Sequence, residues 1–216
     1  LSRDVNGLIA ENRSYLNEDT IKAQKLRFER FNEYSESFHG IVVDIATGLG
    51  GLFSELLKRD GNFISIATDV DPNILVVTNN RLIKAGFNNF NKVAINAKHM
   101  AFKDNMIDFI TTLSGFGNIP DGFSAIEETY RTLKHDGKLV AVLPFVDKDS
   151  ESAAFAKELG VERALIKEYF IEDLERVGFK KINVEIVSSA IWAENPMDAL
   201  PVAGDVQYFA IVQAEK

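Results

Sequence analysis

The stretch Asp44-Ile45-Ala46-Thr47-Gly48-Leu49-Gly50-Gly51 joins a β-branched run to a helical pattern. The run itself, residues 41–46 (Ile-Val-Val-Asp-Ile-Ala), is typical of a strand that is buried on both faces. After the glycines, the apolar residues of 52–57 fall on one face of a helix. Glycines at a strand–helix junction let the backbone approach a ligand closely. We therefore expect a ligand-binding loop in an α/β protein.

The alternation of strand and helix continues along the chain. Strands are predicted at residues 41–46, 63–68, 92–96, 107–113, 138–143, 181–187 and 206–213. Helices are predicted at 72–85, 121–133 and 165–177, with Asp121 as a cap and with ends at Gly86, His135-Asp136-Gly137 and Gly178. Such alternation predicts a doubly wound, Rossmann-like, seven-stranded and mostly parallel sheet with helices on both faces. The last two strands have no helix between them, which predicts an antiparallel hairpin at one edge.

A chain of 216 residues suits one α/β domain, 1–216. Within it we expect an N-terminal helical cap or lid over 1–40, a cofactor-binding core over 41–145, and a substrate-side helix with the C-terminal hairpin over 146–216. The apolar positions of the first segment are Ile21, Leu26, Phe28, Phe31 and Tyr34. In open sheets of this kind, ligands bind beyond the carboxyl ends of the strands.

Composition limits the function classes. The net charge of −8 disfavours a nonspecific nucleic-acid binder, which needs a basic surface. The chain has no cysteine, which excludes disulfides, zinc–thiolate sites and cysteine nucleophiles, and its 3 histidines make a histidine-rich metal cage unexpected. No apolar run approaches the ~20 residues of a membrane span. We predict a cytoplasmic protein with a small-molecule substrate and no metal, nucleic-acid or membrane partner; the oligomeric state stays open.

Asp44 is an acid inside an otherwise apolar strand. A buried carboxylate is costly unless it is paired or hydrogen-bonded. A pyrophosphate would gain nothing from this negative charge, whereas a cationic ligand would. In addition, Phe53 stands where the G-x-G-x-x-G fingerprint of dinucleotide-binding loops has its third glycine. The alternative for Asp44 is that it caps the glycine turn through backbone amides.

A second acidic segment, Thr68-Asp69-Val70-Asp71-Pro72, follows the second predicted strand. Asp69 lies where a doubly wound fold places the acid that holds ribose hydroxyls. Asp71 directly precedes Pro72, so we expect it to be a helix N-cap.

Together these motifs resemble the class I S-adenosylmethionine-dependent methyltransferases over residues 41–145. The D-x-A-x-G-x-G form of 44–50 is similar to the small-molecule branch that includes the ubiquinone/menaquinone-biosynthesis methyltransferases. Residues 96–108 are similar to that branch's D-A-x-x-L-P-F-x-D-x-x-F-D stretch, with Asn96 in place of the usual Asp. Residues 133–139 are like its L-K-P-G-G turn.

The resemblance implies S-adenosylmethionine as the cofactor, with S-adenosylhomocysteine as product. The loop 46–50 would hold the methionine moiety, Asp69 the ribose and Asn96-Ala97 the adenine, while 114–119 would lie beside the reactive methyl group. The implied cofactor-binding residues are Asp44, Ala46, Thr47, Gly48, Gly50, Asp69, Val70, Asn96, Ala97, Ser114 and Gly115.

The acceptor side is less clear from sequence. Substrate-side residues are predicted to be Tyr15, Phe116, Asn118, Phe145 and Trp192, the last in the long connection 188–205. Tyr15, Phe28, Phe31 and Tyr34 form either a lid or an amphipathic helix packed on the sheet, and Trp192 either lines a site or is a hydrophobic plug. No general base stands out; His99 is the one weak candidate, and a surface role suits it as well.

The leading hypothesis is a methyltransferase that acts on a small molecule by in-line displacement. A noncatalytic, regulatory adenosyl-cofactor-binding protein is the first alternative, because no base is evident. An NAD(P)-dependent oxidoreductase shares the glycine loop and Asp69, but Asp44 and Phe53 disfavour it. A protein or nucleic-acid methyltransferase is a further alternative, although Asn118 is followed by Ile-Pro rather than the Pro-Pro-aromatic signature of amino-methylating nucleic-acid enzymes.

Overall fold

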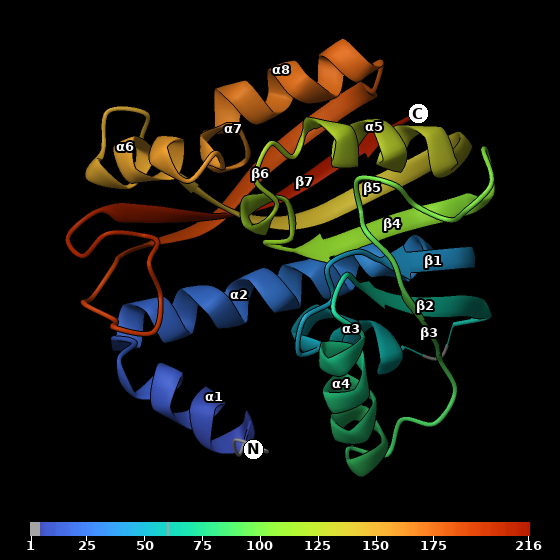
Figure 1. Cartoon of the computed structure of the whole chain (residues 1–216), viewed down its shortest axis with the longest axis horizontal. Helices are drawn as coiled ribbons and strands as arrows, with labels where there is room; N and C mark the ends of the chain where they lie inside the picture. The colour runs from blue at the N-terminus through green and yellow to red at the C-terminus, as the bar shows by residue number, and fades with distance from the viewer. Residues whose placement is uncertain (1–4, 60) are drawn as a thin grey trace.

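A single seven-stranded sheet organises the computed structural model, which describes residues 5–59 and 61–216 (Figure 1). The strands are β1 (Gly40–Asp44), β2 (Phe63–Asp69), β3 (Asn91–Ala94), β4 (Ile107–Leu113), β5 (Leu133–Val146), β6 (Lys180–Ile191) and β7 (Val206–Glu215). Their order across the sheet is β3-β2-β1-β4-β5-β7-β6.

The pairing directions confirm the predicted fold class. Strands β1 to β5 are joined by parallel ladders. β7 inserts antiparallel beside β5, with Val142 opposite Ile211, and β6 pairs antiparallel with β7 at the edge. The order changes direction between β1 and β4, so the carboxyl ends of these two strands form the switch point at which ligands bind in such sheets.

Helices cover both faces of the sheet (Figure 1). On one face, α5 (Phe123–Thr132) and α8 (Lys167–Val177) bury Ile126 and Phe170 in a core. On the other, α2 (Glu18–Tyr34), α3 (Gly51–Leu57) and α4 (Pro72–Lys84) contribute to a second core. The remaining helices are α1 (Val5–Ser14), α6 (Glu151–Glu158) and α7 (Glu162–Leu165), with 3-10 turns at Ser35–Ser37 and Phe116–Asn118.

The helix α2 packs on the sheet, as one of the two alternatives for the N-terminal segment predicts. Its buried face is formed by Thr20, Ala23, Arg27 and Phe31, spaced three and four residues apart. Ile21 and Leu26, which the sequence pattern assigned to the apolar face, are instead 50% and 37% exposed. That prediction was wrong because an arginine and a threonine occupy buried positions that hydrophobicity alone does not reveal.

Several predicted boundaries also need correction. Asp71 caps α4 as predicted, accepting the N–H of Asn73 at 2.8 Å. Asp121 does not cap α5, whose N-cap is Gly122. The segment His135-Asp136-Gly137 does not close that helix either, because Leu133 already pairs with Ile107 in the sheet and is fully buried. The helix predicted at 165–177 is divided at Ile166, whose backbone is extended.

Within the described residues, no helix is both long and apolar enough to cross a membrane.

Candidate functional site

The loop after β1 turns through three residues with left-handed backbone: Ala46 (φ 49°), Gly48 (φ 53°) and Gly50 (φ 79°). A Cβ atom on Gly48 would meet no atom within 4 Å, so the backbone there borders open space. At Gly50 a Cβ atom would lie 2.9 Å from Thr78 Cγ2, so this glycine is required by packing as well as by its φ. The loop therefore offers bare main chain to a ligand on one side and packs against α4 on the other.

Threonine hydroxyls set the shape of this loop. The Thr47 hydroxyl donates to the Asp44 carbonyl at 2.9 Å and accepts the N–H of Thr68 at 3.0 Å. The Thr68 hydroxyl donates to the same carbonyl at 2.9 Å, and Thr78 donates to the carbonyl of Gly48. Because hydrogen bonds within the chain hold it, the loop is organised in advance of any ligand.

Asp69 supports the glycine loop from the neighbouring strand. Its Oδ2 accepts the N–H of Gly48 at 2.9 Å and its Oδ1 accepts the N–H of Asp71 at 3.1 Å. Each carboxylate oxygen has a second lone-pair direction, so the half-buried side chain can still accept hydrogen bonds from the hydroxyls of a ligand.

Asp44 is a buried acid whose carboxylate accepts a hydrogen bond from a threonine hydroxyl and pairs with no cation among the residues that the structure describes. It is 1% exposed, and its Oδ1 accepts the hydroxyl of Thr111 at 2.8 Å. Burial raises the pKa of Asp44 to about 7, with a smaller contribution from the charge of Asp69, while the hydrogen bond from Thr111 opposes the shift. The backbone N–H of Gly48 in the turn donates to Asp69 and not to Asp44. The alternative in which Asp44 caps the glycine turn therefore does not describe the structure.

The end of β4 lies against the glycine loop. Ser114 has φ 58°, and a Cβ atom on Gly115 would collide with Thr112 and lie 3.0 Å from the Cβ of Ala46. Only glycine fits there. The structure thus brings together the first and the fourth predicted motif, residues 44–50 and 114–119, at the switch point of the sheet.

The predicted adenine-binding segment, which begins at Asn96 after β3, is hydrogen-bonded to the rest of the site through the preceding residue. The N–H of Ile95 donates to the Asp69 carbonyl at 2.9 Å. The exposed Asn96 accepts the N–H of Lys98 at 2.9 Å, and Ala97 is buried in the core. Val70, next to Asp69, is 68% exposed.

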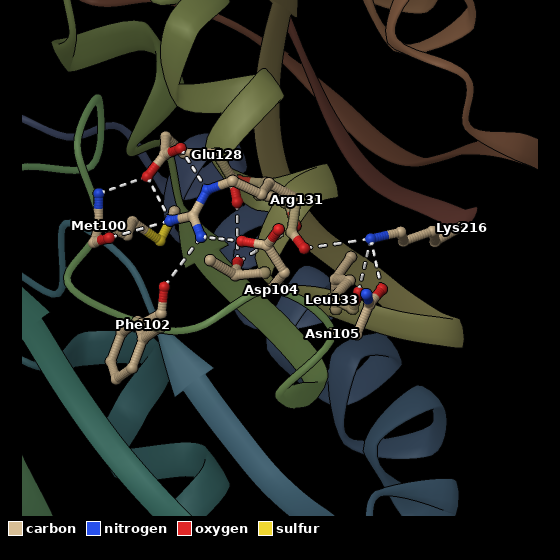
Figure 2. Close-up of polar contacts among 10 residues, drawn as sticks. Met100, Phe102, Asp104, Asn105, Glu128, Arg131, Leu133 and Lys216 are labelled. Atoms are coloured by element: carbon tan, nitrogen blue, oxygen red, sulfur yellow. Dashed lines mark hydrogen bonds and ion pairs between the residues drawn. The ribbon is translucent and has the colours of Figure 1, made fainter.

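A charged pair on α5 fixes the segment that follows Asn96 (Figure 2). Glu128 accepts the N–H of Met100 at 2.6 Å, and Arg131 donates to the carbonyls of Met100 at 3.0 Å and Phe102 at 2.9 Å. The hydrogen bonds from Arg131 hold the pKa of Glu128 below its usual range. Lys216 donates in turn to the carbonyl of Arg131.

A cavity of about 590 Å³ has Ser114 in its lining, and its lining among the described residues includes none of the glycine loop 46–50. Its apolar lining includes Pro144, Val146, Leu165, Trp192, Leu200 and Phe209, and its polar lining includes Gln24, Arg27, Ser114, Asn118, Asp198 and Gln207. This volume lies within the range of small-molecule sites.

The predicted substrate-side residues divide into two groups. Asn118 and Trp192 line the cavity. Phe116 and Phe145 are buried against Phe170 in the core, and Tyr15 is 37% exposed and outside the lining, so the geometry does not favour these three. His99 is exposed, next to Glu128, and does not line the cavity either.

Sequence reasoning missed Arg27 and Gln207. Both line the cavity and both are buried, at 9% and 6% exposure. The only sequence signal for Arg27 is its spacing from Ala23 and Phe31, which places a charge on the apolar face of α2. Gln207 carried no signal of its own.

The fold is that of the class I methyltransferases. A putative methyltransferase from Bacillus halodurans aligns with a TM-score of 0.69 at 18% identity, covering 88% of this chain and 98% of that one. A phosphoethanolamine N-methyltransferase 2 from Haemonchus contortus, solved with S-adenosyl-L-methionine, aligns with a TM-score of 0.64 at 17% identity, covering 87% of this chain and 52% of that one.

The chain belongs to the ubiE/COQ5 methyltransferase family, whose model matches residues 22–159. The ubiquinone/menaquinone biosynthesis C-methyltransferase UbiE of Rickettsia prowazekii is 34% identical over 106 residues, covering 47% of this chain and 43% of its own length. The UbiE of a Marinomonas species is 36% identical over 114 residues, covering 51% and 44%. The matched region thus spans less than half the length of these curated relatives.

Proposed function

We propose that this chain transfers the methyl group of S-adenosylmethionine to a small-molecule acceptor. One observation carries the proposal: Ser114 lines the 590 Å³ cavity, while the adjacent Gly115 packs on Ala46 of the glycine loop. A cofactor on the loop and an acceptor in the cavity would therefore meet at the end of β4. Membership of a methyltransferase family supports this interpretation.

The residues present fit the cofactor. Loop 46–50 receives the methionine moiety, because the backbone at Gly48 borders open space. Asp69 accepts ribose hydroxyls through its remaining lone pairs, and Asn96 with Ala97 receives the adenine. Asp69, together with Asp44 in its ionised form, gives this side of the site a negative field, which suits a cationic ligand and opposes a pyrophosphate. The cofactor supplies a methyl group bonded to a positively charged sulfur.

The chain's own contribution to the reaction is positioning. The walls of the cavity would hold the nucleophilic atom of the acceptor in line with the methyl group that the cofactor would supply. Orientation of this kind is worth roughly 7–11 kcal/mol. The reaction needs no base from the protein when the nucleophilic atom of the acceptor is already deprotonated. In this proposal the segment 41–145 holds the cofactor, while the acceptor side of the same domain is formed by Gln24 and Arg27 from α2, by residues of 146–216, and by Ser114, Asn118 and Pro144 from the cofactor segment.

The acceptor is proposed to be a small molecule rather than a nucleic acid, because the net charge of −8 opposes binding to phosphates. A cytoplasmic location stays a prediction.

Thermal unfolding tests the proposal, with S-adenosylmethionine, S-adenosylhomocysteine, NADH and NADPH compared in parallel. A ligand at about a hundred times its Kd adds about 2.7 kcal/mol of stability, which raises the Tm of a domain of this size by roughly 5–10 °C. We expect this shift with the two adenosyl ligands alone. A shift with a nicotinamide cofactor alone, or with none of the four, would overturn the proposal.

A further inference from the structure

Three buried polar groups without partners converge on the acceptor cavity. Among the described residues, no hydrogen-bond partner exists for Arg27 Nε, Trp192 Nε1 or Gln207 Oε1, although all three atoms are buried. Such groups are rare in folded proteins, because each gives up its hydration without replacement. These three side chains line one cavity of 590 Å³, whereas the other two buried atoms without a partner in the described residues, on Thr20 and Asn32, belong to residues outside its lining. The grouping points to a polar ligand at this wall, toward which the side chains would turn, because the three atoms are closed to solvent as they lie.

The three side chains come from separate elements that meet around Phe209. The guanidinium carbon of Arg27, on α2, lies 5.1 Å from the centre of the Phe209 ring. Gln207 precedes Phe209 by two residues on β7 and therefore points to the same face of the sheet. Trp192, just after β6, packs in the same apolar cluster as Phe209. The fold thus places two N–H donors and one oxygen acceptor in one wall.

Arg27 is a buried positive charge without a carboxylate beside it. No described residue forms an ion pair with it, and its neighbours are the faces of Phe28 and Phe209. Burial lowers the pKa of Arg27 to about 10, which leaves the guanidinium charged at neutral pH. The other charged residue of the lining, Asp198, accepts the side-chain amides of Asn12 at 3.1 Å and Asn195 at 3.0 Å instead.

We infer that the methyl acceptor is a small, largely apolar molecule with an anionic oxygen, which Arg27 binds from the wall formed by α2, β7 and the connection between β6 and β7. The inference rests on the proposed function, since it takes the cavity as the acceptor site. The apolar lining suits the body of such a molecule, and the guanidinium suits a carboxylate or a phenolate.

A fluorescence titration measures this directly, because Trp192 is the single tryptophan of the chain. With S-adenosylhomocysteine bound, the full chain is titrated with 2-naphthoate and with the neutral 2-naphthamide, and in a second arm with 4-nitrophenolate and 4-nitroanisole. Each pair has the same body and differs in charge. We expect the anion to bind about 10- to 100-fold more tightly than its neutral partner in at least one arm. The arm that shows it distinguishes a carboxylate from a phenolate.

Three variants separate a binding role of Arg27 from a structural one. Arg27→Met is expected to lose the preference for the anion, and Arg27→Lys to restore part of it. Arg30→Met, on the same helix but paired with Glu185 outside the cavity, is expected to keep the preference. Arg27→Met removes a buried unpaired charge, so its Tm without ligand is expected to be equal to or above that of the parent chain.

The results also keep the two proposals apart. If S-adenosylhomocysteine fails to bind the parent chain, the proposed function is overturned. If it binds but anion and neutral partner bind equally in both arms, the anionic acceptor is overturned alone. The anionic acceptor is also overturned if Arg27→Met keeps the preference, or if this variant unfolds at lower temperature with its anion affinity unchanged.

Discussion

The carboxylate of Asp69 accepts the backbone N–H of Gly48 at 2.9 Å, so the acid at the end of β2 holds the glycine loop that follows β1. In addition, Ala46 of this loop packs on Gly115 after β4. The candidate cofactor site is therefore connected by direct contacts across three neighbouring strands, β2, β1 and β4.

Replacing this acid tests that connection. In Asp69→Asn one carboxylate oxygen becomes an amide nitrogen, so the side chain can no longer accept both backbone N–H groups and ligand hydroxyls. We expect the affinity for S-adenosylhomocysteine to fall about 10- to 100-fold, measured by calorimetric titration. Asp71→Asn is the matched control, because asparagine caps a helix as well as aspartate does, and its affinity is expected to be unchanged. Equal affinities of the two variants would contradict the assignment.

Alanine variants of two glycines with positive φ distinguish an effect on ligand binding from an effect on the stability of the fold. Gly48 has φ 53° and Gly86, after α4, has φ 95°, and an added Cβ atom would meet no atom within 4 Å at either position. Alanine at either site is expected to cost about 1–2 kcal/mol of unfolding free energy, measured in urea. Only Gly48→Ala is expected to weaken S-adenosylhomocysteine binding, because its methyl group enters the space of the ligand. Parallel losses of affinity in both variants would show that the effect is general strain.

The buried acid Asp44 predicts a pH dependence of stability. Its pKa is about 7 in the fold against an ordinary value of 3.8, so the folded state favours the protonated acid. The contribution of Asp44 to the free energy of unfolding is fully present below pH 3.8 and is lost as the pH rises toward 7. The total loss is on the order of 4 kcal/mol. Asp44→Asn removes this dependence.

The measurement is urea unfolding of the ligand-free parent chain and Asp44→Asn at about pH 5 and about pH 8. The variant is expected to gain stability relative to the parent as pH rises. At about pH 8, where Asp44 of the parent is ionised, the variant is also expected to bind S-adenosylmethionine more weakly because this negative charge is gone. The difference between variant and parent cancels the titration of other groups. A difference that does not change with pH would mean that Asp44 is ionised in the fold at no cost.

The pair Glu128–Arg131 predicts a local effect on the segment beside Asn96 (Figure 2). Arg131→Met removes the hydrogen bonds to the carbonyls of Met100 and Phe102. We expect a loss of about 1–3 kcal/mol and faster hydrogen exchange at the amide of Met100. Asp104→Asn is the control, since Asp104 is an exposed partner of the same arginine and its ion pair is worth little. Unchanged exchange at Met100 in Arg131→Met would exclude this role.

Much of the fold was predictable from local pattern, and so was the position of the candidate cofactor residues at strand ends. The β-branched run before Gly48 and the glycine turns mark strand and helix ends, because burial on both faces and positive φ each restrict residue choice at single positions. Asp69 and Asp71 were placed correctly for the same reason, since a strand end and a helix N-cap are local features. Errors arose where pairing with a distant strand determined the secondary structure. Leu133, for example, belongs to β5 because it pairs with Ile107, and it is not followed by a helix-ending turn.

The candidate acceptor cavity could not be derived in this way. Its walls come from α2, the segment after β4, β5 and the connection between β6 and β7, which local periodicity does not relate to one another. Arg27 is the clearest case: within its own helix it is one of several charged residues, and only the approach of Phe209 from β7 makes it a buried, unpaired cation. The local sequence pattern determines where strands and helices begin and which groups their ends present. Packing between distant segments determines which side chains are removed from water, and therefore which polar groups a ligand in the cavity would have to match.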